Sequence, residues 1–203
     1  MPIDTLVLAT RNEGKLRELA RILGTQVHLA GLDAFPDAPD LPETGATFEA
    51  NALLKARAIA AYTELPAVAD DSGLCVDALN GMPGVLSARW AGQHGDDQAN
   101  LNLLLAQIAD VPDARRGARF VCAAALVVPA DGIPKEWVVT GQVEGRLIRA
   151  PRGTGGFGYD PIFQADGFGV TTAEMTPDAK DAVSHRGRAF RALAPFITHG
   201  SLT

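Results

Sequence analysis

Several residue types that mark particular protein classes are scarce in this chain of 203 residues. There are two cysteines, Cys75 and Cys122, and both lie in apolar, strand-like runs, which favours buried thiols in a reducing compartment over a disulfide. Neither the cysteines nor the four histidines show metal-ligand spacing. Basic residues are outnumbered, with 18 Lys and Arg against 24 Asp and Glu. The net charge of −6 gives no support to a role on nucleic acid or a membrane surface.

Long apolar runs are also absent, and none approaches the length of a membrane-spanning helix. The N-terminus lacks a basic segment followed by an apolar core, so no secretory signal is expected. We therefore expect a soluble, cytoplasmic protein. The length suits one domain over residues 1–203, with room for two lobes, since no repeat, low-complexity segment or shift in composition divides the chain.

The most informative stretch covers residues 66–74, where a short apolar run ends in two acids, a serine and a glycine. A buried strand that ends in polar residues is typical of ligand-binding edges in α/β folds. Because adjacent side chains of a strand point to opposite faces, Asp70 and Asp71 can serve one site only if the chain turns there, and Ser72 and Gly73 predict that turn. The side-chain oxygens of these Asp and Ser residues suit a hard cation such as Mg²⁺. A solvated turn without function is the alternative.

A strand over residues 6–9 and a helix to about residue 23 flank the polar segment 10–15. Lys15 falls in the first turn of that helix, where the dipole disfavours a cation. A bound phosphate would reverse this preference, because the free N–H groups and Lys15 both favour an anion. Lys15 is thus either a solvated lysine or part of a phosphate site.

A second helix is predicted over residues 48–62, because Phe48, Ala52 and Ile59 recur on one stripe of a helix. Lys55 shares that stripe and therefore points inward. Its ammonium group either reaches back to water or extends into a cleft that holds carboxylates or phosphates. Glu43, just outside the helix, is free to turn toward the same place.

The middle of the chain predicts further elements of a mixed sheet. They are a strand over 74–76, a helix over 97–108, and strands over 118–128 and 137–143 that a turn at 129–134 joins as a hairpin. This antiparallel pair, beside the earlier alternation of strand and helix, predicts a mixed sheet. Arg115 and Arg116 are expected in a solvated loop.

A glycine-rich stretch over residues 153–161 carries two aromatic residues and an acid. Glycines let the backbone approach a ligand closely. Phe157 and Tyr159 are costly to expose, and a planar base offers a face on which they could stack. The stretch is therefore either a flexible surface loop or a binding loop for a base.

The C-terminal part begins with Thr176 and Pro177, which predict a capped helical turn that includes Lys180. His185 and Arg186 open the last helix. Lys15, Lys180 and the pair His185-Arg186 are thus expected at the starts of three helices, where positive charge is unfavourable without an anion. These positions suggest that a polyanionic ligand binds where the helices begin.

The candidate residues combine into one kind of chemistry. Carboxylates alone would repel a triphosphate, whereas a bridging Mg²⁺ removes the repulsion and polarises the phosphoryl oxygens. A carboxylate that accepts a proton could then activate an attacking water. The expected reaction is metal-assisted hydrolysis of a nucleoside triphosphate, without a side-chain nucleophile.

Five motifs stand in a fixed order along the chain. They are Ala9-Thr10-x-Asn12-x-x-Lys15, Glu43-Thr44-Gly45-x-Thr47-Phe48-x-x-Asn51-Ala52, Ala69-Asp70-Asp71-Ser72-Gly73-Leu74, Gly155-Gly156-Phe157-Gly158-Tyr159-Asp160-Pro161 and Ser184-His185-Arg186. In this order, from residue 6 to about 194, they resemble the inosine/xanthosine triphosphate pyrophosphatases, also called HAM1-like. The resemblance implies an elongated α/β fold, with a mixed sheet flanked by helices and two lobes around a central cleft. It also implies a homodimer and Mg²⁺-dependent cleavage of ITP, dITP or XTP to the monophosphate and pyrophosphate.

The resemblance also implies roles for single residues. Asp71 would accept the proton and bind the metal, with Glu43 and Asp70 as further metal ligands. Phosphates and sugar would be held by Thr10, Arg11, Asn12, Glu13, Gly14, Lys15, Lys55 and Ser72. The base would stack on Phe157 in a pocket lined by Gly158, Tyr159 and Asp160, and Lys180, His185 and Arg186 would complete the site.

Arg186 is expected to donate to the purine 6-oxo group. The 6-amino group of ATP would leave that donor unpaired, a mismatch that can cost up to ~10⁴-fold in specificity. Some relatives carry an acid where Pro42 stands, so any metal ligand there is missing from this chain. Two other functions remain open: a nucleotide-binding module without turnover, and a Maf-like pyrophosphatase that acts on modified pyrimidine nucleotides.

Overall fold

The computed structural model describes residues 3–11, 15–17, 20–21 and 27–199. The chain forms two compact units, each built from several segments. Unit 1 comprises residues 1–71, 122–141 and 186–203, and unit 2 comprises residues 72–121 and 142–185. Within the described residues, no helix is both long and apolar enough to cross a membrane.

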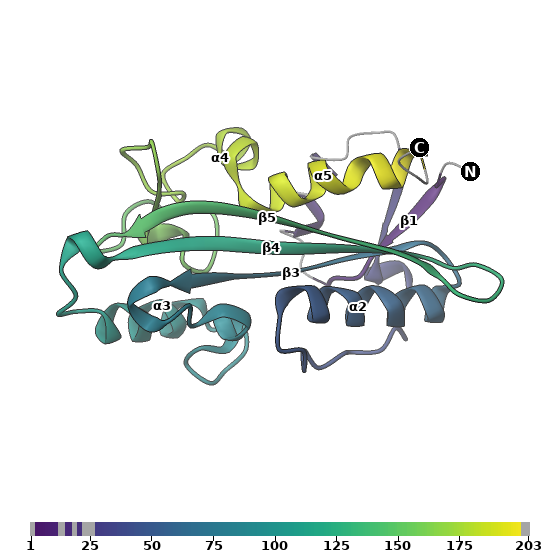
Figure 1. The fold of residues 1–203 in the computed structure, drawn as a ribbon, viewed down its shortest axis with the longest axis horizontal. Coiled ribbons are helices and arrows are strands. Elements are labelled where there is room, and N and C mark those ends of the chain that lie inside the picture. The colour runs from purple at the N-terminus through teal and green to yellow at the C-terminus, as the bar shows by residue number, and fades with distance from the viewer. Residues whose placement is uncertain (1–2, 12–14, 18–19, 22–26, 200–203) are drawn as a thin grey trace. The chain divides into compact units, whose positions relative to one another are not determined.

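The described strands form a sheet in the order β2-β1-β3-β4-β5-β6 (Figure 1). Strand β1 runs parallel to both β2 and β3, whereas β5 and β6 are antiparallel. The predicted α/β class and mixed sheet are therefore confirmed; a cleft between two lobes stays a prediction. The strands are β1 (Thr5–Leu8), β2 (His28–Gly31), β3 (Ala67–Val76), β4 (Gly117–Val128), β5 (Lys135–Leu147) and β6 (Phe163–Ala165).

The helices follow the apolar periodicity of the sequence. The described α-helices are α2 (Phe48–Thr63), α3 (Asp97–Gln107), α4 (Pro177–Val183) and α5 (His185–His199). Short 3-10 helices cover Leu32–Ala34, Asp77–Leu79, Gly84–Arg89, Asp113–Arg115 and Asp160–Ile162. The predictions for residues 48–62 and 97–108 are confirmed. Of the helix predicted up to residue 23, residues 15–17 and 20–21 are helical, and the remainder lies outside the described residues.

Strand β3 overturns one prediction. It continues through Asp70, Asp71, Ser72 and Gly73 to Val76, so neither the turn nor the separate strand over 74–76 exists. Residues on both faces of β3 are buried, and β3 lies between β1 and β4 in the sheet. Pairing and burial in a central strand outweigh the weak local preference of Ser-Gly for a turn.

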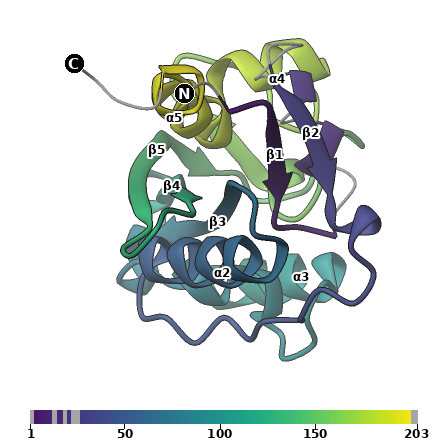
Figure 2. The ribbon, with the colours of Figure 1, turned by 90° about the vertical axis from the view of Figure 1, so that its right-hand side faces the viewer.

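In unit 1, α2 and α5 cover opposite faces of the sheet (Figures 1 and 2). The α5 side holds a continuous apolar cluster, in which Phe190 and Leu193 pack with Leu6, Val68 and Leu126. Cys122 is a buried free thiol in this cluster, as predicted. Thr47 caps the N-terminus of α2, because its hydroxyl accepts a hydrogen bond from the N–H of Ala50 at 3.2 Å.

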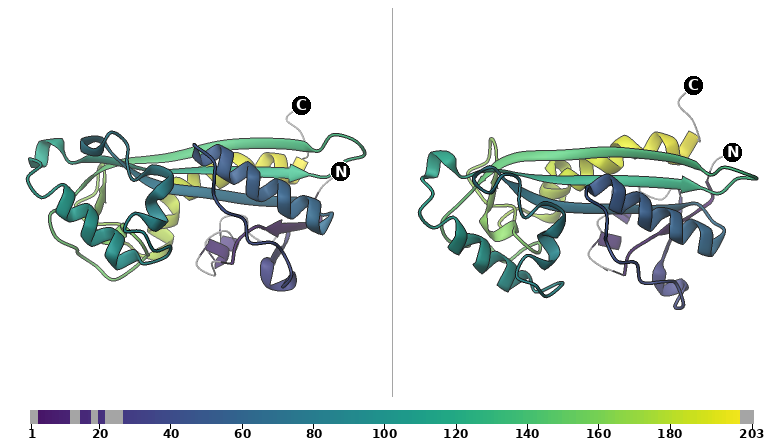
Figure 3. Two further views of the ribbon diagram at one scale, coloured as in Figure 1. Left: turned by 90° about the horizontal axis from the view of Figure 1, so that it is seen from below. Right: turned by 60° about the horizontal axis from the view of Figure 1, so that its bottom comes forward.

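Unit 2 has its own apolar core. Leu101, Leu104 and Ile108, from α3 and the residue that ends it, pack with Leu74 and Phe163 from the strands, and Figure 3 shows α3 from the face that it covers. Cys75 is the second buried free thiol.

The prediction of a solvated Arg116 is wrong. Its side chain is buried, and the guanidinium donates to the carbonyl oxygens of Ile108 at 2.7 Å and Leu147 at 3.0 Å. Arg115 beside it is exposed, as predicted. The carbonyls that surround Arg116 come from residues distant in sequence, which local composition does not reveal.

Candidate functional site

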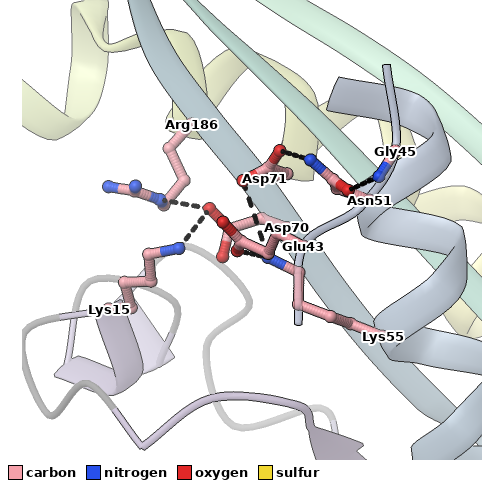
Figure 4. Close-up of polar contacts among 8 residues, drawn as sticks. All are labelled: Lys15, Glu43, Gly45, Asn51, Lys55, Asp70, Asp71 and Arg186. Atoms are coloured by element: carbon pink, nitrogen blue, oxygen red, sulfur yellow. Dashed lines mark hydrogen bonds and ion pairs between the residues drawn. The ribbon is translucent and has the colours of Figure 1, made fainter. Parts of the chain in front are cut away.

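Two adjacent carboxylates of β3 form the centre of the polar cluster in unit 1 (Figure 4). Asp70 and Asp71 lie in an unbroken strand, so their side chains point to opposite faces. Asp71 meets residues of α2, whereas Asp70 meets Arg186 of α5. Both are buried. Strand alternation thus gives each acid its own partner from the flanking helices, Asn51 for Asp71 and Arg186 for Asp70, where the sequence had suggested a shared turn.

Asp71 is oriented by a buried amide. Asn51 donates from Nδ2 to Asp71 Oδ2 at 3.0 Å, and its Oδ1 accepts from the N–H of Gly45 at 2.7 Å. The two bonds together fix which way the amide of Asn51 points. A side chain at position 45 would collide with Asn51 Oδ1, so glycine is required there for the amide to reach the loop.

Lys55 lies between two carboxylates. Its Nζ is 2.7 Å from Glu43 Oε1 and 3.6 Å from Asp71 Oδ1. The inward direction predicted for Lys55 is confirmed, and of the two alternatives the ammonium group takes the one that faces carboxylates. Burial lowers the pKa of Lys55, but the neighbouring carboxylates outweigh it and raise the pKa above its ordinary value.

The same surroundings raise the pKa of Asp71. Burial is the main cause, and the charge of Glu43 adds to it. The positive charge of Lys55 and the hydrogen bond from Asn51 act in the opposite direction. Asp71 is therefore a more basic carboxylate than an exposed one.

Asp70 contacts two cations, on the face of β3 opposite to Asp71. Its Oδ2 lies 3.1 Å from Lys15 Nζ and 3.2 Å from Arg186 Nε. The side chains of Asp70 and Arg186 are each 2% exposed, so this pair is held away from water. Lys15 and Arg186 thus meet a buried carboxylate of the chain itself, and the binding of a polyanionic ligand by these residues stays a prediction.

The remaining candidates of unit 1 are only partly described. Arg11 pairs with Asp40 at 3.3 Å and donates to the carbonyl of Ala38 at 2.9 Å. Thr10 is half-buried. The predicted phosphate-binding residues Asn12, Glu13 and Gly14 lie outside the described residues.

In unit 2, the side chain of Phe157 is the exposed aromatic surface of the glycine-rich loop. The residue is 43% exposed, and Lys180 Nζ lies 5.0 Å from the centre of its ring. Lys180 also pairs with Asp160 Oδ2 at 2.6 Å. Lys180 is in the last turn of α4, not the first, so the prediction that it opposes a helix dipole is wrong.

Asp160 holds the loop together. It is buried, and its Oδ2 accepts from the backbone N–H of Phe157 at 2.9 Å, while Oδ1 accepts from Thr172 Oγ1 at 2.8 Å. Gly156 has a φ of +71°, and a side chain there would collide with the Asp160 carboxylate. Gly156 thus lets the backbone approach the loop's own acid, and a close approach of this loop to a ligand stays a prediction.

Three other candidates of unit 2 are less exposed than Phe157. Tyr159 is buried, and its hydroxyl donates to the carbonyl of Ser87 at 3.0 Å. Burial raises the pKa of that hydroxyl. His185 is buried and stacks on Phe120 with ring centres 4.8 Å apart. Ser72 is half-buried in β3. The substrate contacts assigned to these residues stay predictions.

Two residues of these clusters were missed as site residues. Asn51 stands one turn before Lys55 on α2, and that spacing was the available signal. Asp97, at the start of α3, accepts from the N–H of Gly158 at 2.8 Å. No local signal links Asp97 to the glycine-rich loop, because the two are 61 positions apart.

Comparison with known proteins places these features in a family. The model of the Ham1 family matches residues 6–196. A dITP/XTP pyrophosphatase of Streptomyces coelicolor is 64% identical over 95% of this chain and 96% of that relative. The crystal structure of a nucleoside-triphosphatase / dITP/XTP pyrophosphatase from Mycobacterium abscessus has a TM-score of 0.77 at 57% identity, and covers 94% of this chain and 99% of its own. A HAM1 protein from Coxiella burnetii has a TM-score of 0.85 at 41% identity, with coverage of 95% and 98%. The chain therefore belongs to the Ham1 family.

Proposed function

We propose that this protein is a nucleoside triphosphate pyrophosphatase that hydrolyses dITP, ITP and XTP to the monophosphate and pyrophosphate. The observation that carries the proposal is the set of contacts around Asp71, which is oriented by Asn51 and shares Lys55 with Glu43. Relatives such as the dITP/XTP pyrophosphatase of Streptomyces coelicolor support dITP and XTP as substrates. Such an enzyme removes non-standard purine nucleotides from the precursor pool.

Asp71 is the proposed proton acceptor. Its raised pKa makes it a better base for water than an exposed carboxylate, while the charge of Lys55 favours its ionised form. Asn51 fixes one oxygen, Oδ2, and thereby sets the direction of Oδ1. The proton of the attacking water would pass to this carboxylate.

Glu43 and Asp71 are the proposed holders of Mg²⁺. No group of three or more His, Cys, Asp and Glu side chains in the described part of the chain is arranged to hold a metal ion unaided. That agrees with Mg²⁺, which proteins often bind through one or two carboxylates together with substrate phosphates. Both carboxylates already lie around one positive charge, that of Lys55. When bound, the ion would supply charge neutralisation to the phosphates.

Asp70 fits the metal less well than the other two acids. Its Oδ2 already contacts Lys15 and Arg186. We therefore assign Asp70 the task of holding these two cations, and we assign Lys15, together with residues 10–14, the task of binding phosphate. The 6-oxo contact of Arg186 remains part of the proposal, to be tested by substrate preference.

Phe157 is the proposed stacking surface for the base. Its ring is exposed, while its backbone is fixed by Asp160. Lys180 lies beside the ring and Gly158 follows it. We further propose that the protein acts in the cytoplasm as a homodimer.

The test is a pyrophosphate-release assay over a panel of nucleoside triphosphates, with and without Mg²⁺. We expect release from dITP, ITP and XTP with little from ATP, and a loss of at least ~10³-fold in Asp71→Asn. Asp77→Asn is the matched control, because Asp77 is an exposed acid just after the same strand. Nucleotide binding without release would favour a sensor module, and release confined to modified pyrimidine nucleotides would favour the Maf-like alternative.

A further inference from the structure

Two consecutive backbone N–H groups of the loop that carries Phe157 donate hydrogen bonds to side-chain carboxylates. The N–H of Phe157 donates to Asp160 within the loop at 2.9 Å. The next N–H, of Gly158, donates to Asp97 Oδ2 at 2.8 Å, and Asp97 is the first residue of α3. Both acceptors are carboxylates, which form stronger hydrogen bonds than neutral groups. The backbone on both sides of the Phe157 carbonyl is thus fixed.

The backbone conformation of Gly158 shows why its hydrogen bond to Asp97 matters. This glycine has a φ of +61°, and apart from its chain neighbours no atom lies within 4 Å of the place that a Cβ would occupy. The left-handed backbone, and not a lack of space, is therefore what favours glycine here. Because a glycine populates many conformations, the carboxylate that accepts from its N–H helps to select this one.

The two acids at the start of α3 have separate tasks. Asp96 caps the helix by accepting from the N–H of Ala99 at 3.0 Å. Asp97 follows it and points instead to the glycine-rich loop. The charge of Asp97 also contributes to the raised pKa of Tyr159, which agrees with its position beside this loop.

We infer that Asp97 is a positioning residue for Phe157: it holds the loop so that the ring is presented to a purine base. The inference rests on the proposed function, because that function gives Phe157 its task. It adds a residue outside the motifs of the glycine-rich loop. In this proposal Asp97 acts through the backbone of Gly158 and does not contact the reacting atoms.

The first test compares Asp97→Ala with Asp96→Ala. Loss of one hydrogen bond to the loop should raise the KM for dITP about fivefold and leave kcat within about twofold. Asp96→Ala removes the helix cap but not the loop contact, so its KM should stay within about twofold of the wild type. Asp97→Asn keeps an oxygen that can accept from Gly158, and it should recover most of the loss.

The second test asks whether Asp97 acts through Phe157. In a Phe157→Ala background, adding Asp97→Ala should change the KM by less than about twofold, because the ring that Asp97 positions is gone. A fivefold rise in that background as well would overturn the inference. So would an unchanged KM in Asp97→Ala alone.

A third measurement does not depend on turnover. Hydrogen exchange of the Gly158 amide should become faster in Asp97→Ala and stay at the wild-type rate in Asp96→Ala. If the wild type releases no pyrophosphate from any nucleotide, the proposed function fails, and the exchange rates still decide whether Asp97 holds this loop. Equal exchange in Asp97→Ala and wild type would refute the positioning role.

Discussion

At the scale of single residues, the chemistry of the acidic cluster depends on which neighbours each carboxylate has. Burial and Glu43 raise the pKa of Asp71, while Lys55 lowers it. An Asp71 that accepts a proton must be ionised, so activity should fall as the pH drops through its pKa. In the protein without Mg²⁺, the pKa of Asp71 therefore reports on the two neighbours.

Lys55→Met and Glu43→Gln should move the pKa of Asp71 in opposite directions in the protein without Mg²⁺. Removal of the Lys55 charge raises this pKa, and removal of the Glu43 charge lowers it. NMR titration of the Asp71 carboxyl carbon in each metal-free variant checks this. Arg57→Met, on the same helix but paired with Glu136, should leave the pKa of Asp71 unchanged; shifts in the same direction for Lys55→Met and Glu43→Gln would contradict the assignment.

Arg116→Met should cost about 2–4 kcal/mol in the free energy of unfolding, because it leaves buried carbonyls, including those of Ile108 and Leu147, without a donor. Urea unfolding measures the loss. The matched variant is Arg115→Met, whose side chain is exposed; we expect a change within ~0.5 kcal/mol. Equal losses in both variants would show that the buried contacts of Arg116 contribute little.

The sequence predicted single residues well where a helix stripe set their direction. Lys55 falls on an apolar stripe, and it does point inward to carboxylates. Asn51 was missed as a partner of Asp71, because its role depends on Gly45 in a loop whose path the sequence does not show. Arg116 was placed wrongly for the same reason: the carbonyls that satisfy it come from elements far apart in the chain.

At the scale of elements, apolar periodicity located the helices, whereas turn chemistry failed in β3. Ser72 and Gly73 have the composition of a turn, yet the strand continues to Val76. A central strand gains pairing on both edges, and no local pattern reports that gain. The starts of helices were easier to predict than the path of β3, because a helix cap is a local interaction.

Thr47→Ala should lower the free energy of unfolding by about 1 kcal/mol, because it removes the hydroxyl that caps α2 at Ala50. Since α2 carries Asn51 and Lys55, we also expect lower pyrophosphatase activity. Chemical unfolding and the pyrophosphate assay measure the two effects. Thr44→Ala, at an exposed position outside the helix, is the control and should change stability by less than ~0.5 kcal/mol. A Thr47→Ala protein as stable as the control would argue against the cap.

At the scale of the whole molecule, the two units share three strands. Each of β3, β4 and β5 begins in one unit and ends in the other. Each unit nevertheless has its own apolar cluster. This division could not be predicted from composition, because the boundaries fall inside strands where the sequence shows no change. We expect the shared strands to couple the unfolding of the units.

The chain's two tryptophans test that coupling. Trp90 lies in unit 2, where its Nε1 donates to Gln107 at 2.7 Å, and Trp137 lies in unit 1, packed against Phe196. Trp90→Phe and Trp137→Phe each leave one fluorescent probe. Urea unfolding of the two variants, each corrected by circular dichroism for its own change in stability, should give coincident transitions. A fluorescence midpoint that departs from the circular dichroism midpoint in either variant would mean that the units unfold separately.

The alternation of Asp70 and Asp71 along β3 has an electrostatic consequence. On one face, the contacts of Asp70 with Lys15 and Arg186 leave an excess of one positive charge among these side chains. On the other face, Lys55 meets both Glu43 and Asp71, which leaves an excess of one negative charge. The two sets of charges are close enough to act on each other, since Asp70 influences Lys55 and Lys15 influences Asp71. We therefore expect a ligand that carries both a cation and an anion to be held in one orientation, with its anion toward Lys15 and Arg186 and its cation toward Glu43 and Asp71.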